Sequence, residues 1–162
     1  MMSATIRFAT TDDVDQITQL LVANSAAKGG ALYGSYSTAK VSGWLQRTSP
    51  TVVAIVEGQV VAVLFSASRD AVSAAPVRAM LQAYPGQPDA WIYGPVCIDA
   101  SQRGKQLLSA LVKELKTAMN GREGLLFINE NNPRSIRAHQ RLGMPVVAEF
   151  TLEQQRFVVM TA

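Results

Sequence analysis

Strand-like and helix-like segments alternate along the second half of the chain, and this alternation constrains the fold more than any other feature. Residues 91–98 and 125–128 are short apolar runs typical of strands, whereas residues 104–119 repeat apolar side chains at helical spacing. Residues 132–142 begin with Asn-Pro, which suits the cap and the first turn of a helix. Strands and helices in this order pack as helices on a sheet, so we predict a mixed α/β fold.

The remaining segments extend this pattern toward both ends of the chain. The first half predicts a strand over residues 5–9, a helix after the capping residues 10–13, a helix over 39–46, and a hairpin of strands 51–56 and 60–65. A proline-bearing connection over residues 69–89 contains a short predicted helix over 76–84. Two strands over residues 146–152 and 157–160, joined near Gln154, complete the prediction.

Length and composition fit one domain. The chain has 162 residues, of which 48% are apolar, and about 150 residues per domain is a usual figure. We therefore predict a single domain over residues 1–162. The N-terminus lacks the basic and apolar regions of a signal peptide, and the longest apolar run, residues 60–65, is far shorter than a membrane span. We expect a cytoplasmic protein without a membrane segment.

Positive charge is concentrated in one part of the sequence. Residues 101–141 contain eight basic and three acidic side chains, a net charge of +5, whereas the chain as a whole carries +3. This asymmetry suggests an anionic partner, either a phosphorylated small molecule or a nucleic acid, although a solvated basic surface is the alternative. Nucleic-acid binding would need a broader stripe with aromatic or groove-reading elements. We therefore predict no nucleic-acid partner for the three arginines on one helix face, Arg134, Arg137 and Arg141.

The junction at residues 98–108 is the strongest functional signal. A strand leads through a polar turn into a helix, whose first N–H groups have no partner within the helix and carry partial positive charge. Such a helix start suits a phosphate. Gly104 allows close approach of a ligand to the backbone, and Arg103 and Lys105 add cationic donors. These residue types suit pyrophosphate, although one Arg-Gly-Lys turn also occurs at ordinary helix starts.

The order of the elements and three motifs resemble the GNAT superfamily of N-acetyltransferases. The motifs are Val96-Cys97-Ile98-Asp99, Arg103-Gly104-Lys105, and Asn132 followed by His139 and Leu142-Gly143-Met144. The resemblance implies a twisted, mostly antiparallel sheet of about seven strands, split between the fourth and fifth strands and flanked by about four helices. It also implies acetyl-CoA as the acetyl donor.

The resemblance also implies where acetyl-CoA binds. In the family, backbone groups at the end of the fourth strand, here Val96 and Ile98, pair with the pantetheine arm. Backbone amides of the next turn hold the pyrophosphate, a role that falls on Arg103, Gly104, Lys105, Gln106, Leu107 and Leu108. The family has small residues where this chain has Gln106 and Leu108, so these side chains either point away from the ligand or narrow its site.

The helix over residues 132–142 supplies a second candidate group. In the family, an Asn on this helix precedes by seven residues a Tyr that often acts as general acid for the departing CoA thiolate. Asn132 keeps the first position, and His139 takes the second. Because imidazole can donate a proton near pH 7, the resemblance implies that role for His139, with packing between helix and sheet as the alternative. We assign Asn132 and Ser135 to cofactor binding.

Acetyl transfer also requires a neutral amine and a polarised thioester carbonyl. The strand that contains Tyr93 has no carboxylate, and Tyr93 is the nearest side chain that could order a water as the base. Cys97 has the sequence context of a buried strand, which favours direct attack over an acetyl-cysteine intermediate. Tyr33, Tyr36 and Trp44 flank a glycine-rich loop that covers the acceptor in the family, and they either line that site or pack in the core.

Together these features predict an N-acetyltransferase that transfers acetyl from acetyl-CoA to an amine of a small molecule or protein by direct attack. A non-catalytic acyl-CoA-binding or regulatory module with a degenerate site is the alternative. We predict no metal site. A homodimer is a further hypothesis, since the final strands could pair with a second copy through the unpaired backbone groups of an edge strand.

Overall fold

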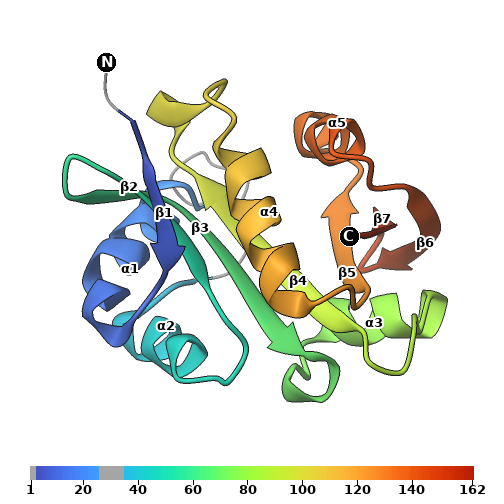
Figure 1. Cartoon of the computed structure of the whole chain (residues 1–162). Helices are drawn as coiled ribbons and strands as arrows, with labels where there is room; N and C mark the ends of the chain where they lie inside the picture. The colour runs from blue at the N-terminus through green and yellow to red at the C-terminus, as the bar shows by residue number, and fades with distance from the viewer. Residues whose placement is uncertain (1–2, 26–34) are drawn as a thin grey trace. The chain divides into compact units, whose positions relative to one another are not determined.

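The computed structural model describes residues 3–25 and 35–162 and has alternating strands and helices (Figure 1). The strands are β1 (Thr5–Phe8), β2 (Val52–Val56), β3 (Gln59–Ser68), β4 (Trp91–Ile98), β5 (Gly124–Asn129), β6 (Val146–Leu152) and β7 (Gln155–Thr161). The helices are α1 (Val14–Ala23), α2 (Thr38–Leu45), α3 (Ala75–Ala83), α4 (Leu107–Met119) and α5 (Pro133–Arg141), with the short 3-10 helices η1 (Thr11–Asp13), η3 (Arg69–Ala71) and η4 (Ala100–Gln102). No helix within the described residues is long and apolar enough to cross a membrane.

The seven strands follow the order β1-β2-β3-β4-β5-β7-β6. β4 and β5 pair in parallel, whereas β1–β2, β2–β3, β5–β7 and β6–β7 are antiparallel. The predicted mixed α/β fold with a mostly antiparallel sheet is therefore confirmed. The described residues form five α-helices, one more than the resemblance implied.

Contacts divide the chain into two compact units. The first comprises Met1–Ser66 and Gly94–Asn120, and the second Ala67–Tyr93 and Gly121–Ala162. β3 and β4 each contribute residues to both units. The single domain expected over residues 1–162 stays a prediction.

The first unit has helices on both faces of its strands. The register pairs Val53 with Val63, and both side chains pack with Ile17 of α1 and Val41 of α2. Alternate residues of β2, such as Ala54, point to the opposite face, and α4 contacts β1 and β2. Burial on both faces explains why β2 is apolar at every position rather than at every second one.

The hairpin between β2 and β3 forms as predicted, with a shorter turn. Glu57 and Gly58 have φ values of 50° and 77°, as expected for a two-residue turn that matches the twist of the strands. Gln59 was expected in the turn but begins β3, which continues to Ser68 rather than ending at residue 65. The side chain of Gln16 links α1 to this hairpin by accepting a bond from the Val60 N–H at 2.7 Å.

The capping residues predicted before α1 form a closed hydrogen-bond network. The Thr10 hydroxyl accepts a bond from the Asp12 N–H, and the Asp13 carboxylate accepts one from the Thr10 N–H at 2.8 Å. The guanidinium of Arg7 donates two bonds to the same carboxylate, at 2.8 and 2.9 Å. The hydrogen bonds from Arg7 hold the pKa of Asp13 below its ordinary value, against the opposing effect of burial.

Replacing Asp13 with asparagine should therefore reduce the pH dependence of stability. Because the folded-state pKa of Asp13 lies below the unfolded value, its stabilisation is present above the unfolded pKa and is lost as pH falls through the folded pKa. We expect Asp13→Asn to lower the free energy of unfolding at pH 7 by about 1 kcal/mol, with a smaller difference from wild type in acid. Urea unfolding at pH 7 and pH 3 measures this, with the exposed neighbour substitution Asp12→Asn as control. A constant difference at both pH values would contradict it.

The second unit is organised around the start of β4 and β5. Their parallel ladder joins Trp91 to Gly124 and Ile92 to Leu125. Trp91 is 1% exposed, and its indole N–H donates a bond to the Arg122 carbonyl at 3.1 Å. Ile92 and Leu125 pack in a core cluster with residues of α3 and β7. A glycine at position 124 allows the indole ring to lie against the backbone of β5.

The start of α4 differs from the prediction. The helix was expected from residue 104 but begins at Leu107. Residues 100–102 form η4 instead, and Gly104 and Gln106 have φ values of 80° and 61°, which lie outside the helical region. The apolar periodicity could not reveal this, because the residues before Leu107 are polar or small and carry no periodic signal.

Candidate functional site

The turn before α4 leaves the first amides of that helix without a cap from the Gln106 side chain. The first three N–H groups of an α-helix have no acceptor within it, and here Ala110 donates to the Gln106 carbonyl at 3.3 Å. The Gln106 side chain makes no capping hydrogen bond to them. Arg103 and Lys105 are both exposed beside these amides, and Lys105 also donates to the Gln102 side chain at 3.3 Å. The turn therefore has the donors and the charge of an anion site.

Gln106 occupies a backbone conformation that favours glycine. Its φ of 61° lies in the left-handed region, which costs roughly 1 kcal/mol or more for a residue with a side chain. A glycine at this position would adopt the same conformation without that cost. The Gln106 side chain is exposed, and Leu107 is buried beneath the helix start.

The end of β4 holds Cys97 in the core of the first unit. The thiol is 5% exposed, between the half-buried residues Val96 and Ile98. Burial, together with the nearby charge of Asp99, raises the pKa of Cys97 to about 12. The thiol is therefore protonated at neutral pH, which disfavours an acetyl-cysteine intermediate.

In the second unit, Tyr93, His139 and Ser135 form a buried hydrogen-bonded chain. The Tyr93 hydroxyl lies 2.8 Å from His139 Nε2, and His139 Nδ1 lies 2.7 Å from the Ser135 carbonyl oxygen. Tyr93 is 6% exposed and His139 only 2%. Two residues selected from the sequence, Tyr93 of β4 and Ser135 of α5, are thus both bonded to a third, His139.

The chemistry of the groups decides which of them donates and which accepts in each of these hydrogen bonds. A carbonyl oxygen can only accept, so His139 Nδ1 carries the proton that is donated to Ser135. In the neutral ring Nε2 then accepts, and the Tyr93 hydroxyl donates to it. Burial lowers the pKa of His139 and raises the pKa of Tyr93, so both are neutral at pH 7. Both ring nitrogens of His139 therefore have partners in the resting protein.

Asn132 caps the start of α5 as the sequence predicts. Its side chain accepts a hydrogen bond from the Ser135 N–H at 3.4 Å, and Pro133 follows in the first turn. Gly143 ends the helix region with a φ of 87°, the left-handed conformation expected for it. The α5 arginines Arg134, Arg137 and Arg141 are all exposed. Asn132 thus has a structural role in addition to its predicted part in cofactor binding.

The aromatic residues expected near the acceptor pack against the core of the first unit. The rings of Trp44 and Phe65 contact edge to face with centroids 4.9 Å apart, and Tyr36 contacts Trp44 at 6.2 Å. The Lys40 ammonium lies over both Tyr36 and Trp44. These contacts support the packing interpretation for Trp44. Tyr33 lies outside the described residues.

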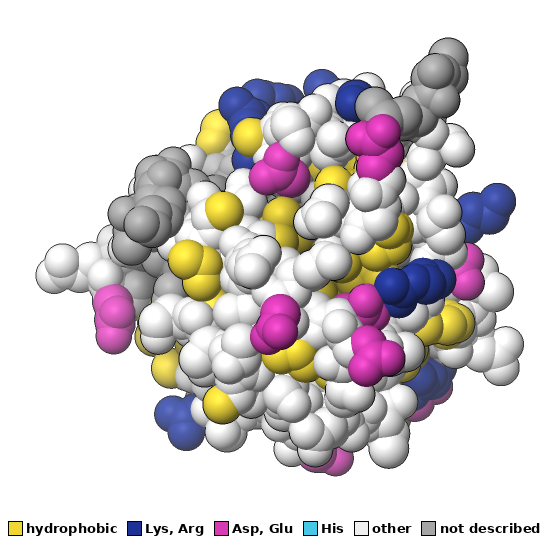
Figure 2. All heavy atoms as spheres, turned by 90° about the vertical axis from the view of Figure 1, so that its left-hand side faces the viewer, with side chains coloured by type: hydrophobic (Ala, Val, Ile, Leu, Met, Phe, Trp, Pro, Cys, Tyr) yellow, Lys and Arg dark blue, Asp and Glu magenta, His cyan; other side chains and the backbone are white. Residues whose placement is uncertain are grey.

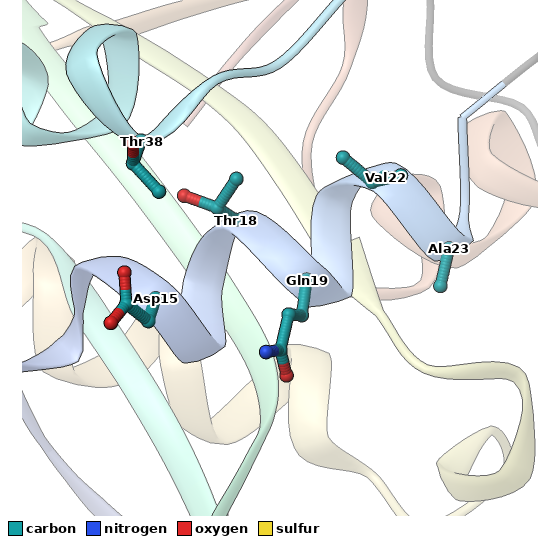
Figure 3. A pocket seen from close by; sticks show the side chains of 6 residues that line it. All are labelled: Asp15, Thr18, Gln19, Val22, Ala23 and Thr38. Carbon is teal, nitrogen blue, oxygen red and sulfur yellow. The ribbon is translucent and has the colours of Figure 1, made fainter.

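A shallow groove of about 660 Å³ runs along α1 to the start of α2. Figure 2 views the side of the molecule on the left of Figure 1 and shows hydrophobic side chains exposed there among acidic and uncharged ones. The groove is lined by Asp15, Thr18, Gln19, Val22, Ala23 and Thr38 (Figure 3). None of the site residues predicted from the sequence lines it.

Sequence reasoning did not assign a role to Asp99. Its carboxylate accepts hydrogen bonds from the N–H and the hydroxyl of Ser101, and so caps η4 at the start of the turn before α4. The spacing Asp-x-Ser after a strand is a signal for such a turn, because aspartate readily bonds the backbone two residues ahead.

The sequence matches a family model, and the structure matches solved structures of the same fold. Residues 32–144 match the model of the Acetyltransferase (GNAT) family. The yncA protein of Salmonella typhimurium, solved with its cofactor acetyl-CoA, is 21% identical with a TM-score of 0.75, covering 99% of this chain and 93% of that one. A phosphinothricin acetyltransferase from Sinorhizobium meliloti, in complex with acetyl-CoA, is 20% identical with a TM-score of 0.71, covering 99% and 88%.

A third structure, the ribosomal-protein-S18-alanine N-acetyltransferase of Escherichia coli, is 13% identical with a TM-score of 0.69, covering 98% of this chain and 92% of that one. No curated protein matches the sequence well enough to count as a relative. The structural matches share the fold, and the family model covers more than half of the sequence. The chain therefore belongs to the acetyltransferase (GNAT) family.

Proposed function

We propose that this protein is an N-acetyltransferase that transfers the acetyl group of acetyl-CoA to an amine of a small molecule or protein by direct attack. The observation that carries the proposal is the start of α4, where uncapped amides lie beside Arg103 and Lys105 in a chain of the GNAT family. Solved structures of the same fold contain acetyl-CoA.

The residues of the turn fit the pyrophosphate of acetyl-CoA. Residues 103–108 supply backbone donors and two cations for the pyrophosphate, and the backbone of Val96 and Ile98 is our candidate for pairing with the pantetheine arm. We also retain Asn132 and Ser135 as candidates for cofactor contacts. Acetyl-CoA supplies an activated acetyl group, and these residues would bind and orient it.

Tyr93 and His139 are the candidate groups for proton transfer. Because Nδ1 of His139 donates to Ser135, Nε2 of the neutral ring can accept the hydrogen bond of the Tyr93 hydroxyl. The lone pairs of the Tyr93 oxygen then stay available to a water or an amine N–H. Protonation of a departing thiolate by His139 would require a proton on Nε2 and release of the bond from Tyr93. The pair therefore supports ordering of a water by Tyr93 more directly than acid catalysis by His139.

A non-catalytic acyl-CoA-binding or regulatory module is the second candidate. It is favoured by Gln106 in place of a small residue and by the hydrogen bonds that already occupy both His139 nitrogens.

A homodimer also stays a proposal. β6 is the last strand of the sheet and exposes Val146 and Val147.

Two measurements, made one after the other, test the proposed function. Calorimetric titration with acetyl-CoA and with CoA at two salt concentrations should give micromolar, salt-sensitive binding, because the pyrophosphate contacts are ionic. Release of free CoA thiol with a panel of amines should then exceed the spontaneous rate. Binding without thiol release would support the binding module, and no binding up to millimolar ligand would contradict both functions.

Replacing Gln106 with glycine should strengthen acetyl-CoA binding about threefold, because glycine lets the ligand approach the helix amides more closely. Gly104→Ala is the matched variant with the opposite expectation: it places a side chain at a φ of 80° and should weaken binding. Titration of both variants with acetyl-CoA measures this. Weaker binding by Gln106→Gly would mean that the glutamine side chain itself contacts the ligand.

A further inference from the structure

Asp99 connects the end of β4 to the turn before α4 through both its backbone and its side chain. Its N–H donates to the Val61 carbonyl at 2.9 Å, which ties the end of β4 to β3. Its carboxylate accepts bonds from the Ser101 N–H at 3.2 Å and from the Ser101 hydroxyl. Its carbonyl accepts a bond from the Gln102 N–H at 2.9 Å. These bonds define the backbone from residue 99 to residue 102.

The charge of Asp99 is unfavourable for the neighbouring anion site. The hydrogen bond from Ser101 is the largest cause that holds the pKa of Asp99 below its ordinary value, and the side chain of Asn24 and the charge of Arg103 act in the same direction. Asp99 is therefore ionised at neutral pH. A carboxylate near a bound pyrophosphate repels it, so any benefit of this residue to binding must come from its hydrogen bonds.

We propose that Asp99 is a positioning residue for the anion-binding turn, in which its carboxylate holds Ser101 and thereby directs residues 103–106 so that the α4 amides face the pyrophosphate. This inference rests on the proposed function, since it concerns the turn that we assign to acetyl-CoA. It extends that assignment to a residue that acts on the turn through Ser101.

If the carboxylate only repels the ligand, Asp99→Ala should bind CoA more tightly, and if it positions the turn, Asp99→Ala should bind CoA more weakly. Asp99→Ala removes both the charge and the acceptor, whereas Asp99→Asn removes the charge but keeps an oxygen that can accept from the Ser101 N–H. We expect Asp99→Ala to weaken CoA and ADP binding by about 5- to 10-fold, and Asp99→Asn to bind them as tightly as wild type or more tightly. Asp70→Ala, which removes an exposed carboxylate elsewhere, should leave binding unchanged.

The probes are chosen to separate the turn from the rest of the protein. CoA and ADP both contain a pyrophosphate, whereas S-acetylpantetheine does not, so its binding should be unchanged in every variant. Tighter CoA binding by Asp99→Ala, or an equal loss for S-acetylpantetheine, would overturn the positioning role. Failure of the wild type to bind CoA and ADP would overturn this inference and the assigned turn together. Binding without acetylation of any amine would overturn the enzymatic proposal alone.

Discussion

Replacing Gly124 with alanine should lower the free energy of unfolding by about 3 kcal/mol, at the upper end of the usual cost of overpacking. A Cβ atom at this position would lie 2.6 to 2.9 Å from three atoms of the Trp91 ring. The ring cannot move away easily, because it is 1% exposed and its N–H is bonded to the Arg122 carbonyl. The added methyl group must therefore displace the indole or the backbone of β5.

Gly43→Ala is the matched control, with an effect of opposite sign. Gly43 lies on the exposed side of α2, and a Cβ there would meet no atom within 4 Å. Alanine favours the helix over glycine, so this variant should gain about 0.5 to 1 kcal/mol. Urea unfolding of both variants measures the difference. Wild-type stability of Gly124→Ala would show that the indole does not pack against this glycine.

Segments with a regular apolar pattern could be predicted from the sequence almost to the residue. β4 extends over the eight residues expected, and the amphipathic part of α4 is helical to Met119. β3 continues three residues beyond its expected end at residue 65, and two further errors lie where conformation depends on single backbone angles. The start of α4 is displaced by the left-handed residues Gly104 and Gln106, and the hairpin turn is shortened by the positive φ of Glu57. Such angles leave little trace in hydrophobic periodicity.

The contact between the candidate residues Tyr93, His139 and Ser135, and the direction of its hydrogen bonds, could not be predicted from the sequence. The local sequence indicated the turn before α4, because a helix start with basic residues suits an anion, whereas the candidate role of His139 came from the family resemblance. The contact of His139 with Tyr93 joins residues 46 positions apart, and the donor role of Nδ1 depends on the backbone carbonyl of Ser135. The Tyr93 contact has no sequence signal, because it requires the fold to bring β4 and α5 together, whereas the Ser135 contact lies within α5 and depends on the orientation of the His139 ring.

Replacing His139 with alanine should lower the free energy of unfolding by about 3 kcal/mol. The substitution leaves a cavity at a side chain that is 2% exposed and deprives the buried Tyr93 hydroxyl of its acceptor. If the pair acts in proton transfer, kcat should also fall about 100-fold, with acetyl-CoA affinity changing far less. Equal losses in kcat and affinity would make His139 a binding or packing residue.

His139→Gln separates the hydrogen bond from the titratable group. Its amide oxygen can accept from Tyr93, so this variant should recover part of the stability lost by His139→Ala, whereas it cannot take up a proton as imidazole does. Because burial lowers the pKa of His139, the unfolded chain binds a proton below about pH 6.5 that the folded protein excludes. The wild type should therefore lose stability relative to His139→Gln as pH falls from 7 to 5, measured by urea unfolding. A difference that stays constant over this range would mean that the imidazole is not held neutral in the folded protein, and the proton acceptor for Tyr93 would have to be sought elsewhere.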